Sequence, residues 1–169
     1  MLAIHPYLVR YPRQVTDLDD LDTAIVRELL HDARRTNRDV AAAVGVAPTT
    51  SLDRTRSLRE RGVILGARLE VDLAKIGRPV QALVAVRVRP PTRANIEGFR
   101  SWATRLPEVL AVFVTSGSED FLIHVAVADN DHLYAFVIDR LTDKPEVADV
   151  RTSIVYEHIA NRAFPLQRD

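Results

Sequence analysis

Residues 37–61, NRDVAAAVGVAPTTSLDRTRSLRER, decide how the first half of the chain folds. Apolar residues recur at helical spacing on both sides of a Gly-Val-Ala-Pro turn. Gly45 stands where a left-handed residue ends a helix, and Pro48 stands at a favoured first helical position. The pattern predicts helices over about 37–44 and 48–61 joined by a tight turn, which is the plan of a helix-turn-helix.

The helix expected over 48–61 has one side for the interior and one for a partner. Leu52, Thr55 and Leu58 are expected to face the interior. In a helix-turn-helix this second helix enters the major groove of DNA, where its amides and short hydroxyl groups approach phosphates and base edges. The candidate DNA-binding residues are Arg34, Arg35, Arg38, Pro48, Thr49, Thr50, Ser51, Asp53, Arg54, Arg56 and Arg59.

Two alternatives stay open for this helix. The first is a solvated amphipathic helix in a small bundle, because helix-turn-helix patterns also arise by chance. The second concerns Arg54 alone, which could pair with the acidic residues of the helix expected from Leu18 onward and serve a structural role. That first helix has Asp19 or Asp20 as its expected cap.

Charge is distributed unevenly, although the net charge of the 169 residues is zero. Residues 17–32 carry six acidic side chains against one arginine, whereas residues 34–61 carry seven arginines against three acidic side chains. All 23 basic residues except Lys75 and Lys144 are arginine, the better bidentate partner for phosphate or guanine. A GC-rich genome would explain the excess of arginine but not the clustering, which favours a nucleic-acid partner.

After Gly62 the pattern becomes that of β-structure. A short hairpin or wing is expected over 63–71, followed by a linker to residue 79. The remaining elements are expected as strands over 80–89, 109–115, 121–128 and 147–156, with helices over 93–105 and 131–141. This β-α-β-β-α-β order predicts a ferredoxin-like domain.

The predicted fold class is therefore α+β, with a winged helix-turn-helix followed by a βαββαβ domain. The expected organisation is an N-terminal arm over 1–16, the winged helix-turn-helix over 17–66, a wing strand and linker over 67–79, the βαββαβ domain over 80–156 and a tail over 157–169. The arm carries too many apolar residues for a solvated tail, so we expect it to pack on a partner subunit.

Residues 18–66, LDDLDTAIVRELLHDARRTNRDVAAAVGVAPTTSLDRTRSLRERGVILG, resemble the start of the Lrp/AsnC family, the feast-or-famine transcription regulators. The family pattern LDxxDxxIxxxLxxxxR and its later motif RxxxLxxxGVIxG are both matched. The matching residues are Leu18, Asp19, Asp22, Ile25, Leu29, Arg34 or Arg35, Gly45, Pro48, Arg54, Leu58, Gly62, Val63, Ile64 and Gly66. The likeness extends over about residues 17–157.

The resemblance implies a sequence-specific DNA-binding regulator of transcription whose effector is an amino acid or a related small metabolite, with no cofactor. Its implied partners are double-stranded DNA and further copies of itself, as a homodimer formed through the βαββαβ domain and as a higher oligomer such as an octamer. The chain departs from the family pattern at Ala33, at Ala47 in place of a Ser or Thr cap, at Thr55 and at Ser118.

The resemblance places the effector near the turn at 116–120, where the family has S-G-D-x-D. Gly117 lets the chain reverse tightly, so that successive N–H groups can hold a carboxylate. Since Ser118 replaces the first Asp of the motif, Glu119 or Asp120 would pair with an ammonium group. The alternative is an ordinary hairpin turn. The candidate effector-binding residues are Thr115, Ser116, Gly117, Ser118, Glu119, Asp120 and Thr152.

Other classes of protein are disfavoured. The chain has no cysteine, its five histidines lack metal-ligand spacing, and it carries no catalytic motif, so we expect neither a metal site nor an enzyme. Its apolar runs are too short to cross a bilayer, and its start does not resemble a signal peptide, so the cytoplasm is expected. Two alternatives remain: an effector-blind architectural DNA-binding protein, and a sirohaem decarboxylase using His124 with Arg87 or Arg89.

Overall fold

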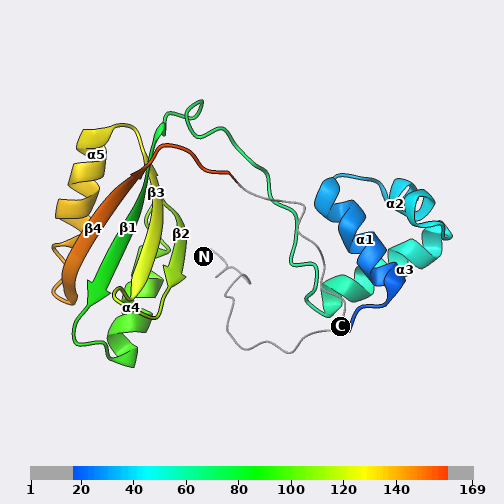
Figure 1. Ribbon diagram of the computed structural model, residues 1–169, viewed down its shortest axis with the longest axis horizontal. Coiled ribbons are helices and arrows are strands. Elements are labelled where there is room, and N and C mark those ends of the chain that lie inside the picture. Colours follow the sequence, from blue (N-terminus) through cyan, green and yellow to red (C-terminus); the bar gives the residue numbers. More distant parts are fainter. Residues whose placement is uncertain (1–16, 160–169) are drawn as a thin grey trace. The chain divides into compact units, whose positions relative to one another are not determined.

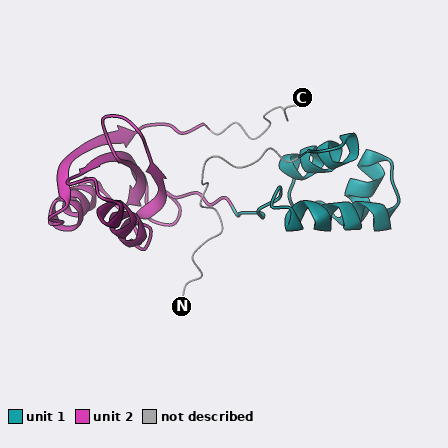
Figure 2. Cartoon of the chain, turned by 90° about the horizontal axis from the view of Figure 1, so that it is seen from below, with its two compact units in different colours: residues 1–69, 160–169 teal, residues 70–159 magenta. Residues whose placement is uncertain are grey.

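The computed structural model describes residues 17–159, which form two compact units, 17–69 and 70–159 (Figure 2). The division falls inside the segment 67–79, which was expected to hold a wing strand and a linker. The arm over 1–16, expected to pack on a partner subunit, and residues 160–169 of the expected tail lie outside the described residues.

Three helices make up the N-terminal unit, close to the ranges predicted from the sequence (Figure 1). They are α1 (Asp20–His31), α2 (Asn37–Val44) and α3 (Pro48–Glu60). Asp19 caps α1, because its carboxylate accepts a hydrogen bond from the Asp22 amide at 2.7 Å. Gly45 ends α2 in the left-handed conformation, with φ of 74°. The predicted helix-turn-helix is therefore confirmed.

The buried side of α3 differs from the prediction. Ser51, Thr55 and Leu58 are buried, whereas Leu52 is 45% exposed. Positions spaced by four and then three residues share a helix face, and the residue next to the first of them is turned away by about 100°. The expected inward position of Leu52 is therefore wrong, and so is the expected outward position of Ser51.

Asp22, on α1, is a buried charge with 1% of its surface exposed. Its carboxylate accepts hydrogen bonds from Arg61 at 2.7 Å and from Arg54 at 3.3 Å. Arg54 also donates to the Asp19 carboxylate at 2.6 Å, and this bond raises the pKa of its guanidinium. A buried carboxylate requires such partners, so the network fastens α3 to the start of α1. The structural alternative for Arg54 is confirmed.

The predicted wing hairpin over 63–71 is wrong, because residues 61–79 contain no strand. The amides of Val63 and Ile64 both donate to the Leu58 carbonyl, at 2.9 and 3.1 Å, and so close the end of α3. These two donors are therefore not available to a strand ladder. Leu69, within the segment expected to form the wing, is 88% exposed.

The C-terminal unit is a four-stranded antiparallel sheet with helices packed on one face (Figure 1). Its elements are β1 (Val80–Val88), α4 (Arg93–Ala103), β2 (Val109–Val114), β3 (Phe121–Val127), α5 (Asn130–Ala135), η1 (Phe136–Leu141) and β4 (Val147–Val155). The strand order β2-β3-β1-β4 is the ferredoxin-like arrangement, as predicted. One difference is that α5 passes into a π-helical turn, η1, where a continuous helix was expected.

The core of this unit lies between the sheet and the helices. Val84 and Val86 of β1 are completely buried, while Ala85 between them is only partly buried on the opposite face, which confirms the alternation expected for this strand. Phe99 of α4 packs on Phe121 of β3, with ring centroids 4.7 Å apart. No helix in the described residues covers the opposite face of the sheet, which we call the open face.

His124 lies on the open face, opposite Leu83. Its Nε2 atom is 3.0 Å from Oε1 of Gln81, and its ring centroid is 6.0 Å from that of His158. Burial lowers the pKa of His124, and the charge of His158 lowers it further. The folded unit therefore favours neutral His124.

We predict that Asp22→Asn lowers the stability of the N-terminal unit by about 2 kcal/mol. This is less than for a fully buried pair, because the partner side chains of Arg54 and Arg61 are 42% and 33% exposed. Amide hydrogen exchange in α1 and α3 measures the loss. The matched control is Asp53→Asn, on the exposed side of α3. Equal exchange in the two variants would contradict the anchoring role of Asp22.

We predict that His124→Gln reduces the loss of stability of the C-terminal unit between about pH 7.5 and pH 5.5. An unfolded histidine, with a pKa of about 6.5, takes up protons in this range more readily than folded His124, so acid destabilises the native protein. Melting followed by the fluorescence of Trp102, in this unit, measures the effect.

His132 supplies the matched control with the opposite sign. Its hydrogen bond to Asp129, 2.7 Å long, raises the pKa of His132, so its stabilisation is present below pH 6.5 and is lost as the pH rises through the folded pKa. His132→Gln should therefore steepen the acid loss. Identical pH profiles for the two variants would refute both assignments.

Candidate DNA-binding and effector sites

One face of α3 is exposed along the length of the helix. Its side chains are Thr49, Leu52, Asp53, Arg56 and Arg59, which we call the α3 stripe. Their spacing follows the helical repeat, so they form a continuous row. Pro48 and Thr50 are also exposed at the helix start, whereas Ser51 is buried and Arg54 bonds to α1. The structure thus keeps most of the predicted recognition residues together and removes two of them.

Leu52 was missed as a surface residue by the sequence analysis. An exposed apolar side chain within a polar row suits contact with the methyl group of thymine in the major groove. The helical spacing in the sequence could have placed Leu52 on the surface, because Ser51 shares a helix face with Thr55 and Leu58 and Leu52 does not.

The candidate DNA-binding arginines differ in whether they form ion pairs with acidic side chains. Among the described residues, Arg38, Arg56 and Arg59 take part in no ion pair. Arg35 pairs with Glu28, and Arg34 lies 3.9 Å from Asp32 in a solvent-exposed contact. The three unpaired arginines are therefore the ones whose charges are available to phosphates.

The start of α3 is held in place by α2. The side-chain amide of Asn37 donates to the Pro48 carbonyl at 2.7 Å, a contact that the sequence did not reveal. Ala47 provides no side-chain cap, so the first amides of α3 are left for another acceptor. The N-terminus of a helix carries partial positive charge, which favours a phosphate at this position.

In the C-terminal unit, the turn between β2 and β3 is closed by its own hydrogen bonds. The Thr115 amide donates to the Asp120 carbonyl at 2.9 Å, and its hydroxyl donates to the Glu119 carbonyl at 2.7 Å. Gly117 has φ of 139°, a conformation that other residues rarely adopt. The predicted tight reversal at this glycine is therefore present.

Both acidic side chains of the turn are paired with arginine. The Asp120 carboxylate accepts hydrogen bonds from the Val88 amide at 2.8 Å and from Arg89 at 3.2 Å, and so ties the turn to the end of β1. Glu119 pairs with Arg151 of β4. An incoming ammonium group would therefore meet carboxylates that already have partners.

Three arginines around the turn were missed as effector residues. Arg87 donates to the Ser118 carbonyl at 2.9 Å, while Arg89 and Arg151 hold the two carboxylates. They come from β1, from the residue that follows it and from β4, far from the turn in sequence, so only the sheet topology brings them together. Guanidinium groups at this position suit an effector carboxylate.

Thr152 does not join this group. It pairs with Val84 in the β1–β4 register, and its neighbour Arg151 pairs with Ala85. Successive residues of a strand point to opposite faces, so Thr152 lies on the side of the sheet opposite to Arg151. The structure therefore does not bring Thr152 to the side of the sheet on which Arg151 meets Glu119.

The described residues contain no cluster of three or more His, Cys, Asp or Glu side chains that could hold a metal ion. His124 bonds to Gln81 rather than lying beside Arg87 or Arg89. No helix within residues 17–159 has the length and apolar character needed to cross a membrane.

Known proteins match both units. An AsnC-type helix-turn-helix domain matches residues 18–59, and an Lrp/AsnC ligand binding domain matches residues 81–163. The chain is 38% identical over 150 residues to the HTH-type transcriptional regulator AldR of Mycolicibacterium smegmatis, covering 89% of this chain and 87% of AldR. It is 33% identical to the transcriptional regulator AzlB of Bacillus subtilis, over 82% and 88% of the two chains.

A solved structure agrees with these relatives. A transcriptional regulator of Neisseria meningitidis in complex with L-Met superposes with a TM-score of 0.81 at 27% identity, over 88% of this chain and 97% of that one. The matched proteins are regulators of transcription, so the decarboxylase alternative is not retained. The chain belongs to the Lrp/AsnC family of transcriptional regulators.

Proposed function

We propose that this regulator reads its operator with the α3 stripe, as a dimer, and responds to an amino acid bound at the turn over 115–120. The observation that carries the proposal is the α3 stripe itself. It presents the unpaired Arg56 and Arg59 on a helix that the buried Asp22 fixes in place. A rigid helix can hold several side chains in register with base edges at once.

Within the α3 stripe the residue types suggest a division of labour. Thr49, Leu52 and Asp53 are short enough to read base edges near the start of the helix. Arg59, and Arg38 from α2, reach phosphates at the walls of the groove and contribute sequence-independent affinity. Arg56, between them, reads a base or holds a phosphate.

A dimer follows from the geometry of DNA and from the open face of the sheet. One recognition helix reads one half-site, and two half-sites lie about 34 Å apart or at a multiple of that distance. The open face carries apolar residues such as Leu83, Ala85 and Leu122, and Phe113 beside them is 53% exposed. A second copy of the chain would cover this apolar surface. Higher oligomers, such as an octamer, would use further surfaces.

For the effector, the turn and its arginines favour a small carboxylate. Amides around Gly117 and the guanidinium groups of Arg87, Arg89 and Arg151 can hold the carboxylate of an amino acid. The L-Met complex of the Neisseria relative supports this class of ligand. Because Glu119 and Asp120 are already paired, we expect weak binding, with apolar branched or aromatic amino acids preferred to acidic ones.

We predict that Arg56→Ala weakens binding to the operator by about 1–3 kcal/mol if it reads a base. Arg59→Ala or Arg38→Ala should instead weaken all DNA sequences alike and reduce the slope of affinity against salt by about one ion. Titrations over a range of salt concentrations, on an operator selected from random duplexes, measure both effects.

Arg27→Ala, an exposed arginine of α1 outside the α3 stripe, is the matched control and should leave DNA binding unchanged. A folded Arg56→Ala, Arg59→Ala double variant with wild-type affinity would refute the placement of DNA on α3.

We also predict that Gly117→Asp abolishes any change in DNA binding or oligomer size caused by amino acids, while basal DNA affinity stays unchanged. The substitution adds a negative charge where a carboxylate would bind and strains a residue with φ of 139°. Calorimetry with the twenty common amino acids, on the wild type and the variant, measures the loss.

Gly98→Asp, at an exposed position of α4 with no neighbouring atom within 4 Å of an added Cβ, is the matched control. If no amino acid binds wild-type protein with a Kd below about 10 mM, the effector-blind architectural alternative replaces this part of the proposal.

A further inference from the structure

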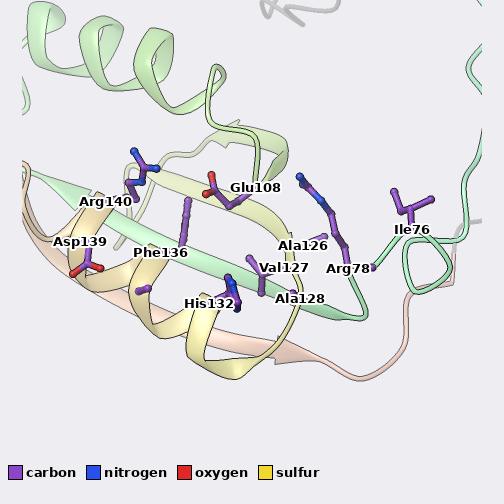
Figure 3. A pocket seen from close by; sticks show the side chains of 12 residues that line it. Ile76, Arg78, Glu108, Ala126, Val127, Ala128, His132, Phe136, Asp139 and Arg140 are labelled. Carbon is purple, nitrogen blue, oxygen red and sulfur yellow. The ribbon is translucent and has the colours of Figure 1, made fainter.

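A cavity of about 410 Å³ lies at the end of the sheet opposite to the 115–120 turn (Figure 3). The end of β3, the residue before β2, the α5–η1 helix and the loop ahead of β1 form its walls. All of them belong to the C-terminal unit. The volume is within the range of small-molecule sites.

Glu108 lines this cavity and carries an unsatisfied acceptor. Its Oε2 atom is buried and has no hydrogen-bond partner among the described residues. The residue itself is held firmly, since its carbonyl accepts the Ala126 amide at 2.9 Å. A buried carboxylate oxygen without a donor is costly, and a donor from a bound molecule would remove that cost.

Two arginines line the cavity together with Glu108. In Figure 3 Glu108 lies between Arg140 and Arg78, while Asp139 points away from both. Arg140 takes part in no ion pair within the described part of the chain. Arg78 donates to the carbonyl of Pro107 through one nitrogen, and its remaining N–H groups stay available. The cavity is therefore lined by one negatively charged acceptor, the Glu108 carboxylate, and by two guanidinium groups that donate hydrogen bonds.

The remaining walls are apolar and include a rare backbone conformation. Phe136, Val127 and Ile76 line the cavity beside the charged groups. Phe136 and Arg140 both belong to the π-helical turn η1. Such turns occur frequently at functional sites, where they reposition side chains that an α-helix would place differently.

We propose that this cavity is a second ligand site, which binds a small zwitterion of the α-amino acid class. The ligand ammonium donates to Glu108, its carboxylate binds Arg140 and Arg78, and an apolar side chain contacts Phe136. The site does not depend on the 115–120 turn. Since Ile76 and Arg78 lie in the segment that leads from the DNA-binding unit to β1, a bound ligand holds the end of that connection against the sheet.

Hydrogen–deuterium exchange on the full-length protein tests the site, with each of the twenty common L-amino acids as probe. We expect at least one of them to protect peptides around 76–80 and 132–140, in the wild type and in Gly117→Asp alike. Protection confined to 113–121, or absent everywhere up to about 10 mM ligand, would overturn the proposal. Loss of the turn response in Gly117→Asp, with protection at 132–140 retained, would separate the two sites.

Variants and ligand analogues test the chemistry. Glu108→Gln and Arg140→Gln should each weaken binding by about tenfold or more, because each removes a charged partner of a hydrogen bond. The matched controls are Glu97→Gln and Arg93→Gln, an exposed pair on α4 that does not line the cavity.

The 2-oxo acid and the amine that correspond to the best ligand should each bind about tenfold more weakly, because each lacks one charged group. A 2-oxo acid that binds as tightly as the amino acid, or a folded Glu108→Gln variant with wild-type affinity, would refute the role of Glu108. Arg140→Gln keeps the test decisive if Glu108→Gln does not fold.

Discussion

The buried carboxylate of Asp22 is the constraint on which the presentation of the DNA-binding surface depends. A charge with 1% exposure must be neutralised, and the chain supplies Arg54 from the middle of α3 and Arg61 from the residue that follows the helix. The helix is therefore fixed both along its axis and in its rotation. Once that rotation is fixed, Leu52 and Arg56 face solvent and Ser51 and Thr55 face inward. Arg54 and Arg61 therefore have a structural role within the unit, while Arg56 and Arg59 remain exposed on α3.

In the C-terminal unit, the backbone of one strand rather than a set of ion pairs positions the two candidate ligand sites. A single strand, β3, begins beside the 115–120 turn and ends at the cavity of Glu108. Seven rigid, mostly buried residues separate the two places, and the same sheet positions both. Ligands at the two ends would contact different connections of the chain: the β2–β3 turn at one end and the segment before β1 at the other. The sheet acts as the common frame.

Much of this architecture could be predicted from local patterns, because caps, glycine turns and alternation are decided by residues close in sequence. Asp19, Gly45 and the two faces of β1 are examples. Leu52 was expected inside and Ser51 outside because the apolar character of leucine was weighed above the helical spacing, which favours Ser51 beside Thr55 and Leu58. The expected wing failed because Val63 and Ile64 instead complete the end of α3. The arginines around the 115–120 turn and the orphan oxygen of Glu108 are products of tertiary packing, which no short motif records.

The strand order leaves β2 and β4 at the two edges of the sheet, and the two edges differ in kind. Along β4, Asp149 and Arg151 place charges that discourage pairing with a foreign strand. β2, with the sequence VLAVFV, carries no charge, and Leu110, Phe113 and Val114 are exposed. Such an edge is a template for intermolecular β-pairing. The colloidal solubility of this protein therefore depends on β2 being covered, and aggregation should begin at this edge whenever it is left bare.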